Sequence, residues 1–254
     1  MSGALVTGAG DDFGGGLEAL LDSLSAPASP APGWFGKLSM LGDFAHRRLP
    51  SDFVAACDDW LSAGMAASRQ QMDDSRWLEA YLTGPLWRFA WAPGVAGEAW
   101  WFGLMMPSVD KVGRYFPLLV ARSAEQPPQS LAGFAALEAW FDAVGAAVLA
   151  TLQPGATLEA FDAALGRLPA WVPPASPPPR PKMALLSGRE RCTLEGPASL
   201  SQWLTACGSL EALQRCAGHS LWWPDHAHSA DNSLSIAPGL PDPEHFSLLL
   251  QGVW

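Results

Sequence analysis

Apolar residues recur at helical spacing in two long segments of the chain. Pro-Ser-Asp at 50–52 is a helix-start signal, and Phe53, Trp60 and Leu61 fall on one stripe after it. This pattern predicts a helix that runs to about residue 71. From 129 to 151, leucine, phenylalanine and tryptophan follow the i, i+3, i+4, i+7 rule of a helix with one buried face. Shorter helices are predicted over 75–82, 158–165, 199–205 and 243–250, the last with Asp242 as its N-cap.

Short apolar runs predict strands over 34–38, 86–91, 99–106, 116–122, 220–223 and 233–236. The turn at 93–97 is too short for anything but an antiparallel connection. Tryptophans occur as adjacent pairs at 100–101 and at 222–223. Neighbours in a strand point to opposite faces, so both faces of the sheet should be covered. We therefore expect an α/β fold in which a mixed, partly antiparallel sheet lies between helices.

The chain divides into a leader and one globular domain. Residues 1–32 are rich in Gly, Ala, Ser and Pro, which predicts a flexible N-terminal leader, although leucines from 17 to 24 have the spacing of one short helix. The domain should span 33–254. Its stretch 172–181 is dominated by proline, and this composition predicts an irregular loop or an internal linker.

Composition narrows the possible partners. The 254 residues are 49% hydrophobic and 16% charged, which favours a packed globule over disorder. The net charge of −10 disfavours binding to nucleic acid or to an anionic membrane surface. We find no long apolar run and no signal peptide, and therefore expect no membrane insertion. The 4 cysteines form no CxxC pair, and the reducing cytoplasm is the expected location.

The segment 106–117 predicts a stiff loop between two strands. Gly113 allows a sharp turn, and prolines at 107 and 117 stiffen both ends. Ser108, Asp110, Lys111 and Arg114 lie between them. One interpretation is that Asp110 and Arg114 fix this loop to the segment 42–48, because an arginine forms bidentate pairs with a carboxylate such as that of Asp110 or Asp43. The other is that these residues form a partner-binding edge.

The segment 42–49 gives a similar choice. Asp43, His46, Arg47 and Arg48 lie between an apolar strand and a helix. The basic cluster has the chemistry to contact an acidic or phosphorylated partner. The alternative is a solvated loop in which Asp43 caps a turn.

Catalytic and metal-binding alternatives have weaker support. Ser108, His46 and Asp110, or His219 with Asp225, contain the residue types of a hydrolase, but no GxSxG motif is present. His226 and His228, with Asp225 and Asp231 nearby, have residue types that bind metals, although their segment has the polarity of a loop. We therefore predict no enzymatic activity, no cofactor and no metal.

Two segments of the chain resemble one known family. Members of the TagF (ImpM) family open with a glycine-aromatic-x-Gly-Lys-Leu segment, followed by Gly-Asp-Phe and Arg-Arg-Leu-Pro. Here these stand at 33–38, 42–44 and 47–50. The family's Met-Pro-Ser-Val-Asp-x-Val-Gly-Arg-x-Phe-Pro segment is unbroken at 106–117. Shorter matches occur at 85–89, 220–223 and 239–241.

The resemblance implies both a fold and a function. It implies a three-layer α/β/α sandwich and an accessory role in bacterial type VI secretion. It further implies post-translational negative regulation through binding of a forkhead-associated scaffold protein. A structural subunit of the secretion machine is the alternative, followed by a hydrolase. The resemblance does not specify the oligomeric state or the face that binds.

Overall fold

The computed structural model describes residues 31–171, 182–186, 189–193, 208, 211–212, 214–225 and 233–254. Residues 1–30 of the predicted leader, the proline-rich stretch 172–181 and the helix expected at 199–205 lie outside the described residues.

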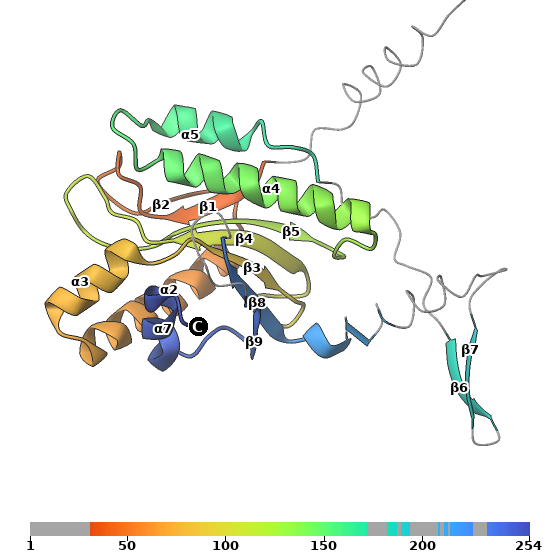
Figure 1. The fold of residues 1–254 in the computed structure, drawn as a ribbon. Coiled ribbons are helices and arrows are strands. Elements are labelled where there is room, and N and C mark those ends of the chain that lie inside the picture. The colour runs from red at the N-terminus through yellow and green to blue at the C-terminus, as the bar shows by residue number, and fades with distance from the viewer. Residues whose placement is uncertain are drawn as a thin grey trace, which may run out of the picture.

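A seven-stranded sheet in the order β2-β1-β5-β4-β3-β8-β9 forms the middle of the molecule (Figure 1). Its strands are β1 (Gly33–Gly36), β2 (Ala45–Arg47), β3 (Trp87–Trp91), β4 (Trp100–Met106), β5 (Leu118–Ala124), β8 (His219–Pro224) and β9 (Ser235–Pro238). A second sheet pairs β6 (Lys182–Leu186) with β7 (Arg189–Thr193).

All strand pairs of the seven-stranded sheet are antiparallel, whereas the sequence predicted a mixed sheet. A long helical connection usually joins parallel neighbours. Here α2 (Ser51–Gln71) and α3 (Asp74–Thr83) carry the chain from β2 to β3, on the far side of β5 and β4. The strands joined by these helices are therefore not neighbours, and the helices do not fix a parallel pair.

Helices cover both faces of the sheet, which confirms the α/β fold class. On one face lie α4 (Leu131–Ala150) and α5 (Leu158–Leu165), above the sheet in Figure 1. On the other lie α2, α3 and α7 (Phe246–Gln251), and a short 3-10 helix, η1 (Pro243–His245), precedes α7. Asp242 precedes η1, but its side chain makes no capping hydrogen bond. The layers are those of an α/β/α sandwich.

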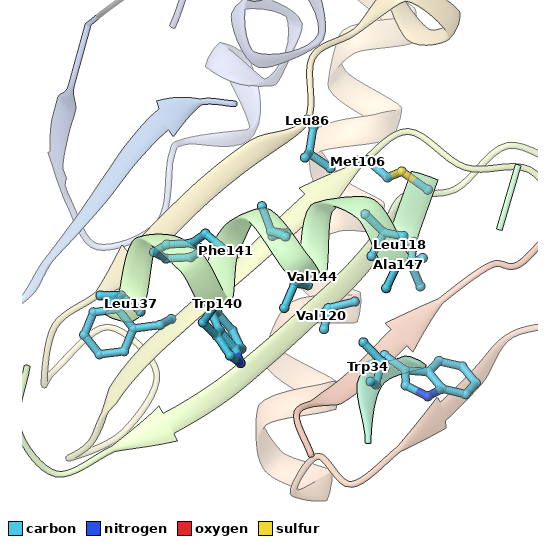
Figure 2. Packing of buried hydrophobic residues seen from close by; sticks show 14 of the residues in the cluster. Trp34, Leu86, Met106, Leu118, Val120, Leu137, Trp140, Phe141, Val144 and Ala147 are labelled. Carbon is cyan, nitrogen blue, oxygen red and sulfur yellow. The ribbon is translucent and has the colours of Figure 1, made fainter. Parts of the chain in front are cut away.

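The α4 face is sealed by aromatic and aliphatic side chains. Figure 2 shows α4 lying across the sheet, with Trp140 and Val144 directed toward Val120 on β5. Helix α4 is also long and apolar enough, over 132–150, to cross a membrane by length and composition. In this structure its apolar stripe packs on the sheet, which is the behaviour of a core helix.

The adjacent tryptophan pairs divide between the two faces as predicted. Trp100 and Trp223 pack in the cluster beneath α4. Trp101 and Trp222 pack in the cluster on the opposite face, against α2 and α7. The two faces of the sheet therefore have separate cores, and each strand contributes side chains to both.

Strand β2 is an element that the sequence predicted as a loop. It has only three residues, and His46 and Arg47 are exposed, so it has no apolar alternation that would mark a strand. Pairing with β1 places His46 opposite Phe35 and Arg47 opposite Trp34. Pairing with β1, and not the local sequence, makes this segment a strand.

Gly103 marks a tight contact between neighbouring strands of the sheet. A Cβ added there would lie 2.2 Å from the carbonyl oxygen of Val120 and 2.5 Å from the ring of Phe89, its cross-strand partner. Because a backbone atom cannot yield as a side chain does, we predict that Gly103→Ala lowers the free energy of unfolding by about 2 to 3 kcal/mol. Urea denaturation measures it. Gly42→Ala, where a Cβ meets nothing within 4 Å, is the control and should leave stability unchanged.

Candidate functional site

Two loops meet at the end of the sheet where β1 and β5 lie side by side. The first covers residues 37–44 and the second residues 107–117; together we call them the paired loops. Gly36 pairs with Leu118, so both loops leave the sheet at the same point. The Lys111 amide donates to the Leu41 carbonyl at 2.8 Å, and the Arg114 guanidinium donates to the Gly42 carbonyl. The sequence expectation that these loops are adjacent is met in the geometry.

Asp110 is the centre of the paired loops. Its buried carboxylate accepts from the Lys37 ammonium at 2.9 Å and from the Arg114 Nε at 2.7 Å. It also accepts from the amides of Val112 and Arg114 at 3.0 and 2.9 Å. Four donors thus close the loop around one carboxylate. Gly113, with φ of 86°, supplies the left-handed residue that this tight turn requires.

Electrostatics keep Asp110 ionised. Burial alone would raise the pKa of its carboxyl, but the hydrogen bonds from the Arg114 amide, the Lys37 ammonium and the Arg114 side chain outweigh burial and hold that pKa well below its usual range. Lys37 is itself buried, and its ammonium lies 4.8 Å from the ring centre of Phe44. A buried charge pair of this kind is costly to break, because the partner would be left uncompensated.

Ser108 is part of the same buried base. Its hydroxyl donates to the Lys37 carbonyl at 2.8 Å, and its amide and carbonyl exchange hydrogen bonds with the Tyr81 hydroxyl. His46 lies on β2, exposed to solvent. The hydroxyl proton of Ser108 is therefore directed at a backbone carbonyl and not at an imidazole. This arrangement lacks the hydrogen-bonded chain of a Ser-His-Asp triad.

The outer half of the paired loops faces solvent. Val112 is 68% exposed and Phe44 is 47% exposed, and both are large apolar side chains. The exposed Arg114 side chain lies 3.7 Å from the still more exposed carboxylate of Asp43. Lys111 is also exposed. Two exposed apolar side chains, Val112 and Phe44, and the charged side chains beside them thus form the outer part of loops whose inner part is held by the hydrogen bonds of Asp110.

Arg47 and Arg48 belong to a different cluster from Asp110. Both donate to the carboxylate of Asp162 on α5, at 2.7 and 2.6 Å. These hydrogen bonds, that from Arg48 first, lower the pKa of Asp162 to about 2. Arg48 also donates to the Pro32 carbonyl at 2.9 Å. The basic cluster expected from the sequence is therefore divided, because its arginines hold α5 to β2 while Asp43 faces Arg114.

A second buried ion cluster was not foreseen from the sequence. Arg88 on β3 contacts Asp225 at 2.6 Å, Asp142 at 2.6 Å and Glu138 at 2.8 Å. Burial alone would lower the pKa of Arg88, but hydrogen bonds to Asp225 and Asp142 raise it. An arginine inside the apolar run 87–91, with carboxylates four apart on an apolar helix, is the signal that would have revealed it.

The remaining catalytic and metal alternatives gain no support. Asp225 pairs with Arg88, and the His219 imidazole contacts the Ala217 carbonyl at 2.8 Å. His226, His228 and Asp231 lie outside the described residues. Within the part of the chain that the structure describes, no group of three or more His, Cys, Asp and Glu side chains is placed to hold a metal ion.

Asp110→Asn tests the base of the paired loops. An amide cannot neutralise Lys37 and Arg114, so we predict a melting temperature several degrees lower at pH 7. Since the folded pKa of Asp110 is lowered, its contribution is fully present above the unfolded value of about 4 and is lost progressively as the pH falls from there through the folded pKa. Thermal denaturation from pH 7 to pH 3 should show the two proteins converging. Asp43→Asn, an exposed change in the same loops, should leave the melting temperature unchanged.

Asp162→Asn tests the attachment of α5. The pair is partly exposed and screened by salt, so we predict a loss of only about 1 kcal/mol at pH 7 and low ionic strength. The loss should disappear as the pH falls from about 4 toward the folded pKa of about 2. Chemical denaturation at low and high salt measures it. A loss that is the same in 1 M salt would contradict the electrostatic origin.

Comparison with known proteins places this architecture in a family. Residues 33–168 match the model of the TagF N-terminal domain, described as type VI secretion system-associated. The crystal structure of PA0076 from Pseudomonas aeruginosa PAO1 superposes with a TM-score of 0.67 at 40% identity, covering 87% of this chain and 94% of that one. None of the curated proteins compared with the chain matches it.

The family match covers more than half of the chain, and the solved relative is similar over nearly its whole length. The chain therefore belongs to the TagF family of type VI secretion-associated proteins.

Proposed function

We propose that this protein acts in the cytoplasm as a post-translational negative regulator of type VI secretion, by binding a forkhead-associated scaffold protein through the paired loops. Membership of the TagF family gives the accessory role in type VI secretion. The observation that supports docking of a partner is the construction of the paired loops, in which an exposed apolar and charged tip stands on a buried, hydrogen-bonded base.

The base lowers the entropic cost of binding. Asp110 ties Lys37, Val112 and Arg114 into one network, so the tip is ordered before a partner arrives. Ordering loops and side chains on association costs affinity, and a preorganised loop avoids most of that loss. The tip is thus suited to recognition without any rearrangement of the chain.

The tip offers both an apolar anchor and charge. Val112 and Phe44 supply large exposed apolar surface, the kind of group that is buried at the centre of interfaces. Lys111 and Arg114 place positive charge beside it, with the exposed carboxylate of Asp43 3.7 Å from Arg114, although the chain as a whole carries −10. These cations favour an acidic or phosphorylated side chain on the scaffold.

Inhibition by binding alone would not require a chemical reaction. A protein that binds one state of its partner shifts the partner's equilibrium toward that state. Occupying the scaffold would withdraw it from assembly in proportion to the concentration of the regulator. The fold provides a surface for this mechanism, and the mechanism requires no catalytic group.

The test is a binding measurement with the purified forkhead-associated scaffold of the same secretion system. We predict that Val112→Asp, which places a charge at the apolar tip, weakens binding by at least about tenfold. The matched control is Leu82→Asp, since Leu82 on α3 is 61% exposed and Val112 is 68% exposed. Isothermal titration calorimetry with both variants and the unchanged chain gives the comparison.

The two variants separate the possible outcomes. Equal affinity of Val112→Asp and the unchanged chain would refute the paired loops as the docking surface while leaving scaffold binding intact. Absence of any complex at micromolar concentrations of the unchanged chain would refute scaffold binding itself. Unchanged melting temperatures are expected for both variants, because neither side chain is buried.

A further inference from the structure

An apolar groove of about 450 Å³ lies on the α4 face of the sheet. Its walls include Trp100 and Phe102 of β4, Phe134 and Leu137 of α4, and Leu221 and Trp223 of β8. The volume falls in the range of clefts that accept several side chains or a small ligand. The groove is therefore large enough for a recognition site.

The groove has apolar side chains that the described part of the chain leaves open to solvent. Phe134 is 48% exposed and Leu234 is 55% exposed, and both line it. A single exposed apolar residue is ordinary, but two that border one apolar depression form a patch of the kind found at interaction sites.

Two exposed carboxylates on α4 border the groove. Glu138 lines it, and Asp142 follows one helical turn later on α4. Both carboxylates contact the guanidinium of Arg88, which also pairs with Asp225, so the two of them together exceed the charge of that one cation. The Glu138 and Asp142 side chains are 54% and 70% exposed, so much of this negative charge faces solvent. Such a border attracts cations and repels anions.

We propose that the groove binds an amphipathic segment of a partner protein, which packs leucine or aromatic side chains against Phe134 and places a lysine or arginine beside Glu138 and Asp142. The apolar lining favours the leucine or aromatic side chains of the ligand, and the exposed carboxylates favour its lysine or arginine. Nucleic acid and anionic metabolites are disfavoured by the same charges. The mode is that of an amphipathic helix laid in a groove.

This site is separate from the paired loops. The groove is lined by Trp100, the first residue of β4, whereas the second loop follows Met106, the last. Seven residues of strand separate these two points by roughly 20 Å. Where the groove extends to Trp223, it lies on β8, with β3 and β4 between it and β5, from which the second loop leaves. Both surfaces can therefore be tested on one protein with independent substitutions.

The experiment uses the full chain and two labelled synthetic peptides. Both have leucine and phenylalanine at i, i+3, i+4 and i+7; one has lysines on its polar face and the other glutamates. We expect fluorescence anisotropy to show the lysine peptide binding at least about tenfold more tightly than the glutamate peptide. Phe134→Ser should abolish that binding, whereas Leu82→Ser, at an exposed leucine of α3, should not change it.

A matched pair of double variants separates site binding from general attraction to an acidic protein. Glu138→Gln with Asp142→Asn should weaken the lysine peptide about tenfold. Asp74→Asn with Glu79→Gln removes the same charge from exposed positions on α3 and should change little. Val112→Asp should leave peptide binding unchanged, so this result does not depend on the paired loops.

Several outcomes would overturn the proposal. These are no binding of the lysine peptide, equal binding of both peptides, or equal losses in the two double variants. Sedimentation of the unchanged chain and of Phe134→Ser tests whether a second copy of this chain occupies the groove instead. Self-association that Phe134→Ser abolishes would assign the groove to a second copy of this chain and refute the proposed partner segment.

Discussion

The fold depends on a sheet whose central strands are buried on both faces. Every residue of β3 and β4 is buried, including tryptophans that point to opposite sides. Such strands are stable only if each face receives its own layer of helices, which α4 and α5 supply on one side and α2, α3 and α7 on the other. Polar side chains that could recognise a partner are consequently confined to the ends of the strands. A charged side chain between the layers needs a partner of opposite charge. The paired loops and the Arg88 cluster are these two cases.

The two ion clusters differ in their balance of cations and carboxylates. At the paired loops, Lys37 and Arg114 both face the carboxylate of Asp110, and Arg114 also lies 3.7 Å from the carboxylate of Asp43. At the Arg88 cluster, one guanidinium faces three carboxylates. This cluster lies toward the same end of the strands as the paired loops, because Arg88 pairs with Leu104 near the end of β4. Each cluster neutralises its buried charges with hydrogen-bonded partners, as desolvation requires, and includes exposed charged side chains at its rim. The ion pairs of the paired loops thus hold equal numbers of opposite charges, whereas the carboxylates that contact Arg88 outnumber its guanidinium.

Much of this architecture could be predicted from the sequence, because it is encoded in local patterns. The stripe that includes Trp60 and the paired tryptophans at 100–101 correctly indicated helix α2 and a sheet covered on both faces. Strand direction could not be predicted, since it depends on which strands become neighbours. Strand β2 was missed because three residues paired only with β1 carry no pattern of their own. The Arg88 cluster joins three distant segments, and proximity of that kind appears only after folding.

The same distinction applies to the candidate site. Sequence reasoning set loop fixing against partner binding as exclusive roles for residues such as Asp110 and Arg114. In the structure the roles divide by depth, because Asp110 is wholly enclosed while the Arg114 side chain that holds it is about half exposed. The buried Asp110 carboxylate fixes the loop, and the exposed part of the Arg114 side chain is still able to contact another protein. The loop-fixing bonds are thus the physical means by which a docking surface would be kept rigid, and stability and recognition would be separable by substitution at different depths.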